Sequence, residues 1–211
     1  MWTWLRIVAW VTGITGAVLL VLYLFVFDVW RVPVDDPLLA ASVEPTLNAG
    51  DVLLVTRHSS VGRGNLLRCA DPQAPGRFVV ARAVATSGEM LELQNEVMTI
   101  DAHRTPSPRA CDAPTHTVYD PQTGMDVELY CAIEDFGQAS FSVLRSREHP
   151  VPPTKVNVEP GRWYLLSDDR HIHLDSRDYG PIDPGTCEHI VFRLVGAAGV
   201  RDRDARMTVI W

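Results

Sequence analysis

The chain is poor in lysine: Lys155 is its only one, and its other fixed positive charge is arginine. The formal net charge is −7 at pH 7, which argues against nucleic-acid binding because that function needs a basic surface. No Cys-x-x-Cys spacing occurs, so we expect no structural zinc site, and no cofactor is expected. Beyond the apolar N-terminal segment, the sequence contains no long amphipathic helical pattern. These absences favour an acidic, β-rich domain.

The N-terminal segment is a long uncharged run, from Ile7 to Phe27, between Arg6 and Asp28. As a helix it spans roughly 30 Å, the thickness of the hydrocarbon layer of a bilayer. A cleavable signal peptide is the alternative, but the run is longer than the usual signal core. The positive charge before the run and the acidic residues after it predict an N terminus in the cytoplasm. We therefore predict a single-pass anchor in the cytoplasmic membrane, with membrane lipid as a partner.

The rest of the chain is expected outside the cytoplasm, where disulfides can form. We assign residues 1–30 to the anchor and 31–211 to one domain with an insertion at about 101–160. All four cysteines lie in that domain. Three pairings are possible, and we favour Cys111 with Cys131 because both fall in the insertion.

Short apolar runs bounded by Gly, Pro and Asn predict strands in this domain. They indicate a mainly β fold with an antiparallel sheet. The predicted strands are Asp51–Thr56, Gly64–Cys69, Arg77–Val84, Met90–Leu93, Glu96–Ile100, Trp163–Leu166 and Ile190–Val195.

Two segments carry candidate chemistry. Ser42 opens the stretch SVEPTL soon after the anchor, and a serine on such a turn can be a nucleophile if a base lies within reach. The alternative is an ordinary loop. The stretch from Ser167 to Ile182 is dense in Asp and Arg, which can neutralise one another beside a reactive group or simply form a solvated loop.

Taken together, these blocks resemble the type I signal peptidases, membrane-anchored serine endopeptidases that remove signal peptides. The family has an anchor, then Ser-Met-x-Pro-Thr-Leu with Gly-Asp, where this chain has SVEPTLNAGD. It has Lys-Arg before Gly-Asp, where this chain has VVARAVATSGE. It has Gly-Asp-Asn-Arg-x-x-Ser-x-Asp-Ser-Arg, where this chain has SDDRHIHLDSR. The resemblance covers nearly the whole chain except the insertion.

The resemblance implies that Ser42 is the nucleophile. It implies that Arg82 with Asp168 is one pair that braces the site, and that Asp175 with Arg177 is a second. The oxyanion would be held by the backbone N–H of Ser42.

The main departure is at the general base. The family's catalytic lysine is replaced by Ala81, which cannot accept a proton, and Lys155 matches no catalytic block. The serine that contacts that lysine in the family is replaced by His173. A histidine has an ordinary pKa of about 6.5, so it can act as a base near neutral pH. We predict that His173 takes the proton of Ser42, with Asp175 as its orienting acid.

By the same resemblance, the substrate is a signal peptide that adds as a strand beside Arg77–Ala83. Its small side chains would meet Val43, Val80 and Ala81. His171 is expected to face solvent, and a metal site made of His171 and His173 is not expected because no third ligand is evident.

Two other functions stay open. One is an inactive homologue, with His173 a product of drift, that binds signal peptides or export-machinery partners. The other is a maturation protease dedicated to one or a few substrates.

Overall fold

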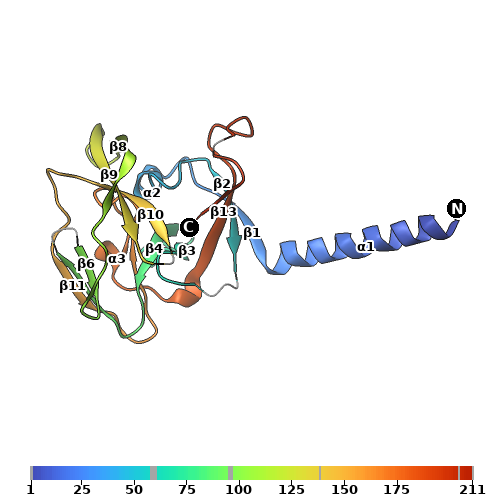
Figure 1. The fold of residues 1–211 in the computed structure, drawn as a ribbon, viewed down its shortest axis with the longest axis horizontal. Helices are drawn as coiled ribbons and strands as arrows, with labels where there is room; N and C mark the ends of the chain where they lie inside the picture. Colours follow the sequence, from blue (N-terminus) through green and yellow to red (C-terminus); the bar gives the residue numbers. More distant parts are fainter. Residues whose placement is uncertain (1, 58–60, 95–96, 138, 204, 211) are drawn as a thin grey trace.

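The computed structural model has one long helix, α1 (Trp2–Phe25), that extends away from a β-rich body (Figure 1). In its described residues, the body contains three antiparallel sheets and only short helices, α2 (Pro37–Ser42), α3 (Ser176–Tyr179) and the 3-10 turn η1 (Pro184–Thr186). The prediction of a mainly β domain after one apolar helix is confirmed. The structure describes residues 2–57, 61–94, 97–137, 139–203 and 205–210.

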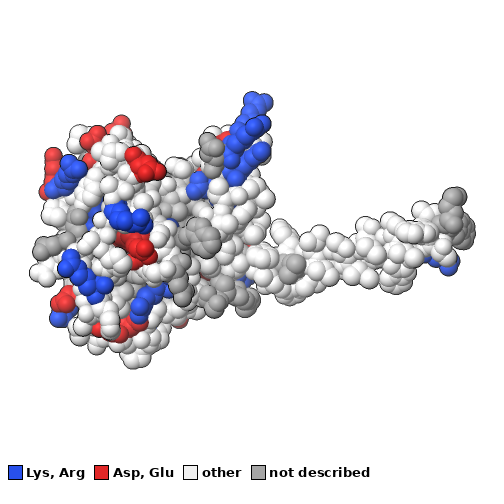
Figure 2. Space-filling view, viewed as in Figure 1, with Lys and Arg blue, Asp and Glu red and all other residues white. Residues whose placement is uncertain are grey.

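Helix α1 is apolar and exposed. Its window Thr3–Val21 has a mean hydropathy of 1.8 and is 0% buried against the rest of the protein. By length and composition it can cross a membrane, although an N-terminal signal sequence would have the same properties. In Figure 2 the helix is a white rod along most of its length, because Arg6 is its one charged residue.

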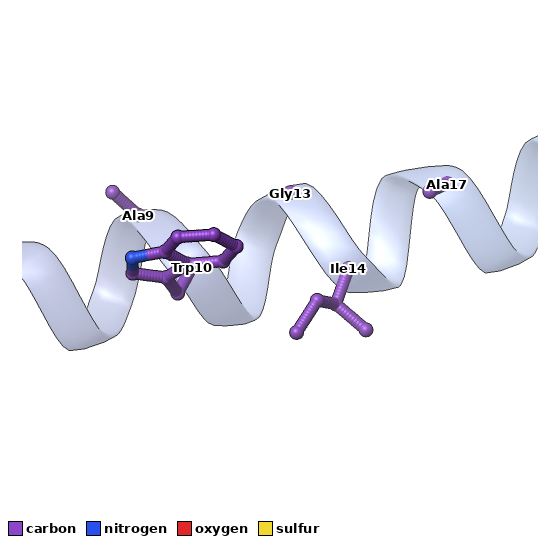
Figure 3. Close-up of a pocket in the computed structure, with 5 residues that line it drawn as sticks. All are labelled: Ala9, Trp10, Gly13, Ile14 and Ala17. Carbon is purple, nitrogen blue, oxygen red and sulfur yellow. The ribbon is translucent and has the colours of Figure 1, made fainter.

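One face of α1 carries small residues at four-residue intervals, Ala9, Gly13 and Ala17 (Figure 3). Trp10 and Ile14 flank them and leave a shallow hollow between their side chains. The hollow is lined mainly by apolar groups of a single helix, and none of its side chains is ionisable.

The main sheet has seven strands, and its order brings together segments that are distant in the chain. Strand β1 begins at Phe27, directly after α1, so the chain joins the sheet inside the segment assigned to the anchor. Six strands follow the order β1 (Phe27–Arg31), β2 (Val52–Thr56), β13 (Cys187–Val195), β3 (Leu66–Ala70), β4 (Phe78–Ala85) and β12 (Tyr164–Leu166), and β14 (Thr208–Val209) pairs with β13.

Strand β4 is covered on both faces, and this positions the candidate site. Successive side chains of a strand point to opposite faces. Val80 packs on one face in a cluster with Leu39 and Val43, from α2 and its C-cap. Ala81 packs on the other face in a cluster with Leu165. The α2 segment therefore lies over the Val80 face.

The predicted insertion supplies every strand of the second sheet and part of the third. The second has the order β10 (Ser140–Arg145), β9 (Met125–Asp135) and β8 (Arg109–Asp120). The third has the order β11 (Thr154–Asn157), β5 (Met90–Gln94), β6 (Val97–Ile100) and β7 (His103–Arg104). Its β5–β6 pair is the predicted hairpin, although Glu96 lies outside the described residues.

The β8–β9 hairpin covers α2. Val118 of β8 and Leu129 of β9 share a buried cluster with Ala41, the residue before Ser42. A region whose purpose is not readable from the sequence therefore forms a wall of the candidate site.

Two disulfides join the strands. The predicted bond between Cys111 and Cys131 is present and links β8 to β9. Cys69 of β3 and Cys187 of β13 form the second, and they are direct partners in the ladder, with Cα atoms 4.0 Å apart. This bond closes a loop with a sequence separation of 118, against 20 for the first.

Replacing both cysteines of each bond by alanine tests their contributions. Loop-closure entropy predicts a loss of about 5 kcal/mol of unfolding free energy for Cys69 and Cys187, and about 3 kcal/mol for Cys111 and Cys131. Denaturant unfolding of the full chain in detergent measures both. Equal losses, or a larger loss for the short loop, would contradict the prediction.

Candidate active site

Ser42 is the last residue of α2. The helix begins after Asp36, whose carboxylate accepts a hydrogen bond from the backbone N–H of Leu39 at 3.1 Å. Ser42 is 0% exposed, and its Oγ donates to the carbonyl of Leu39 at 2.9 Å. No described side chain accepts a hydrogen bond from this hydroxyl. Attack on a substrate therefore requires the hydroxyl to leave Leu39.

Arg82 and Asp168 form a buried, two-pronged ion pair. The distances are 2.7 Å from Nε to Oδ1 and 3.1 Å from Nη2 to Oδ2. Thr46, four residues after Ser42, donates its hydroxyl to Asp168 at 2.5 Å. Arg82 also donates to the carbonyl of Gly64 at 2.7 Å. The pair expected from the resemblance is thus in place and joins three segments of the chain.

Asp175 and Arg177 form the second expected pair. Nη2 of Arg177 lies 2.6 Å from Oδ2 of Asp175, which also accepts the N–H of Ser167 at 2.8 Å. Burial alone raises the pKa of Asp175, but the Arg177 charge and these hydrogen bonds outweigh it and hold the pKa below its usual value. Asp175 is therefore a fixed anion.

His173 is oriented by an acid that the sequence analysis did not assign. Its Nδ1 lies 2.9 Å from Oδ2 of Asp178, in the first turn of α3, whereas Asp175 is occupied by Arg177. One nitrogen of His173 and one oxygen each of Asp175 and Asp178 lie within 4.8 Å of one another. Asp178 could have been found from the D-x-x-D capping pattern, because its side chain accepts the N–H of Asp175 at 3.0 Å.

These three side chains have the donor atoms of a metal site. Asp175, however, already shares its oxygens with the Arg177 guanidinium and a backbone N–H. A cation there would face a fixed positive charge, so the donor set is a poor fit for a metal ion.

The proposed substrate-contact residues are all buried: Val43 and Val80 are 1% exposed and Ala81 is 0%. Strand β12 pairs with β4 only at Arg82, Ala83 and Ala85. Within the described ranges, no strand pairs with the Phe78–Ala81 half of β4 on that edge.

The side chains of Lys155 and His171 contact other groups than Ser42. Lys155 donates to Glu92 at 2.9 Å across the exposed pairing of β11 and β5. His171, expected to face solvent, is half-buried and stacks on His149 with ring centroids 5.4 Å apart. Burial and the charge of His149 lower the pKa of His171.

Asp169 touches Ser42 and was missed by the sequence analysis. Its backbone N–H donates to the Ser42 carbonyl at 3.1 Å. Oδ1 accepts the N–H groups of His171 and Ile172, both at 2.8 Å, whereas the buried Oδ2 has no hydrogen-bond partner among the described residues. Burial raises the pKa of Asp169 to about 7, despite these two N–H groups. The family pattern has Asn at this position, so the presence of Asp169 instead was the sequence feature that could have pointed to this residue.

An open cleft of about 480 Å³ adjoins this network. Its lining includes Pro45 and Thr46, which follow Ser42, together with Arg82 and, from β10, Ser140. Ser42 is not part of that lining, so the cleft reaches only the segment that follows the nucleophile candidate.

Comparison with known families agrees with the motifs. The family model described as "Signal peptidase, peptidase S26" matches residues 4–192. The chain belongs to this signal peptidase family. It is therefore related to peptidases of the serine class, and the family implies substrates that bear signal peptides.

Among solved structures, the chain is similar to a signal peptidase I from Enterococcus faecalis V583. The identity is 15%, the TM-score is 0.41, and the match covers 63% of this chain and 97% of that one. No curated protein matches the chain.

The Arg82 pair gives a stability prediction. Replacing Arg82 by Met leaves Asp168 charged and buried, and removing one partner of a buried pair costs about 3–5 kcal/mol. Thermal and denaturant unfolding should show this loss. Arg77→Met is the matched control, because the Arg77 side chain is 54% exposed and loss of its pair with Asp36 should cost much less stability than loss of the buried pair. Similar effects of both substitutions would contradict the assignment.

Proposed function

We propose that this member of the signal peptidase family is a serine endopeptidase that cleaves signal peptides from exported proteins at the membrane surface. Ser42 is its nucleophile, and His173 replaces the lysine of the family's dyad. The observation that carries the proposal is the complete bracing network, two Arg–Asp pairs and Thr46, around a serine in the matching motif.

The chemistry follows from the groups present. Ser42 Oγ attacks the scissile carbonyl while a neutral imidazole takes its proton, and the same imidazole returns the proton to the leaving amine. The hydrogen bond from Nδ1 to Asp178 orients the ring and stabilises the imidazolium, so the other ring nitrogen is the one that would take the proton of Ser42. The side chain of His173 is 29% exposed, so a bound substrate can reach it.

Substrate binding uses the unpaired half of β4. A signal peptide that adds as a strand beside Phe78–Ala81 would gain backbone hydrogen bonds there. Attack on that peptide requires the α2 segment to shift and expose Ser42, because Ser42 is fully buried. Its neighbours Leu39 and Val43 pack with Val80.

The topology belongs to the same proposal. Helix α1 is a single-pass anchor with its N terminus in the cytoplasm, and the β-rich domain lies outside. Both disulfides suit that compartment.

A second function is favoured by one observation. The Ser42 hydroxyl donates a hydrogen bond to the Leu39 carbonyl and to no described base, as expected of an inactive homologue that binds signal peptides.

Ser42→Ala distinguishes the two functions. The full chain in detergent is incubated with a preprotein that has a small-x-small cleavage site, and the new N terminus is sequenced. A peptidase predicts specific cleavage by wild type, and loss of an attacking group predicts a fall of about 10⁴-fold or more in Ser42→Ala. The matched control is Ser140→Ala, which changes an exposed serine that lines the cleft. This variant should cleave like wild type.

Equal rates for wild type and Ser42→Ala would overturn Ser42 as the nucleophile. Preprotein binding by wild type without cleavage would instead establish the inactive homologue.

A further inference from the structure

Asp169 connects the two parts of the proposed catalytic pair. Its backbone N–H holds the carbonyl of Ser42, and its Oδ1 closes the turn that carries His171 and Ile172, next to His173. One residue therefore sets the position of the nucleophile relative to the loop that bears the base.

The second oxygen of the Asp169 carboxyl lies outside the surrounding network of ion pairs and hydrogen bonds. Asp169 is 0% exposed, and its Oδ2 has no hydrogen-bond partner in the described part of the chain. Neighbouring arginines are directed elsewhere: Arg145 and Arg170 bind Glu134, and Arg177 binds Asp175. A buried, half-satisfied carboxylate is costly when ionised.

The charges that face Asp169 do not offset that cost. Glu44, two residues after Ser42, disfavours the ionised form, and Arg177 from α3 favours it more weakly. His171, in the same turn, contributes its backbone N–H. Leu144 of β10 also packs beside Asp169, and the next residue of that strand, Arg145, is paired with Glu134.

We propose that Asp169 is a proton-switched positioning residue: when protonated it holds Ser42 and the His173 turn in the competent arrangement, and when ionised its buried, unpartnered Oδ2 draws the side chain toward water and loosens that link. The inference rests on the proposed peptidase function. It adds an alkaline limit on activity, distinct from the acid limit expected of a histidine base.

The sign of the effect on stability is set by linkage. Because burial raises the pKa of Asp169 from 3.8 to about 7, the folded state favours the protonated form. The contribution of Asp169 to the free energy of unfolding is complete below about pH 4 and is lost as the pH rises to about 7. Above about pH 7 the free energy of unfolding no longer changes through this group.

The test compares wild type with Asp169→Asn from pH 5 to 9, in preprotein cleavage and in thermal unfolding of the full chain in detergent. Asparagine keeps the Oδ1 acceptor and cannot ionise. Wild-type cleavage should fall about tenfold per pH unit above pH 7, whereas the Asn variant stays level. As the pH rises to about 7, the melting temperature of Asp169→Asn should increase relative to that of wild type.

Two further variants sharpen the result. Glu44→Gln removes the repulsive neighbour and should move the alkaline limit to lower pH. Asp126→Asn, at an exposed carboxyl on β9, removes the same charge elsewhere and should reproduce the wild-type profile.

Parallel wild-type and Asn cleavage profiles, in an enzyme that cleaves, would overturn the inference, whether or not the melting temperatures differ. Failure of the proposed function is recognised separately, as absence of cleavage by wild type at every pH, and it would remove the positioning role with it.

Discussion

The buried pair between Arg82 and Asp168 is the constraint on which the site depends. Their side chains are 1% and 0% exposed, so neither charge can be released to water without unfolding its surroundings. The pair fixes β4 to the loop after β12, and Thr46 adds the segment that follows Ser42. Three distant parts of the sequence are thereby held in one place, and the groups proposed for catalysis lie on these parts.

Ala81 lies on β4 at the position that the resemblance assigns to the family's lysine. On its face of β4, Ala81 packs against apolar side chains such as Leu165 and Leu174. The ionisable groups instead gather along the loop from Asp168 to Asp178. The base that we propose belongs to that loop, where His173 and Asp178 meet and Asp169 binds Ser42.

The sequence predicted much of the fold because periodic apolar runs bounded by turn residues specify strands locally. It predicted both Arg–Asp pairs and the bond between Cys111 and Cys131. It did not predict that Asp178, rather than Asp175, contacts His173, because the preference of Asp175 for Arg177 depends on burial. The role of the β8–β9 hairpin as cover for α2 depends on packing between residues far apart in sequence, which no local pattern reveals.

The central claim is that His173 is the base, and the cleavage rate of His173→Ala relative to wild type tests it most directly. We predict that His173→Ala loses activity at every pH tested while still binding the preprotein. Cleavage by His173→Ala at the wild-type rate would contradict the account.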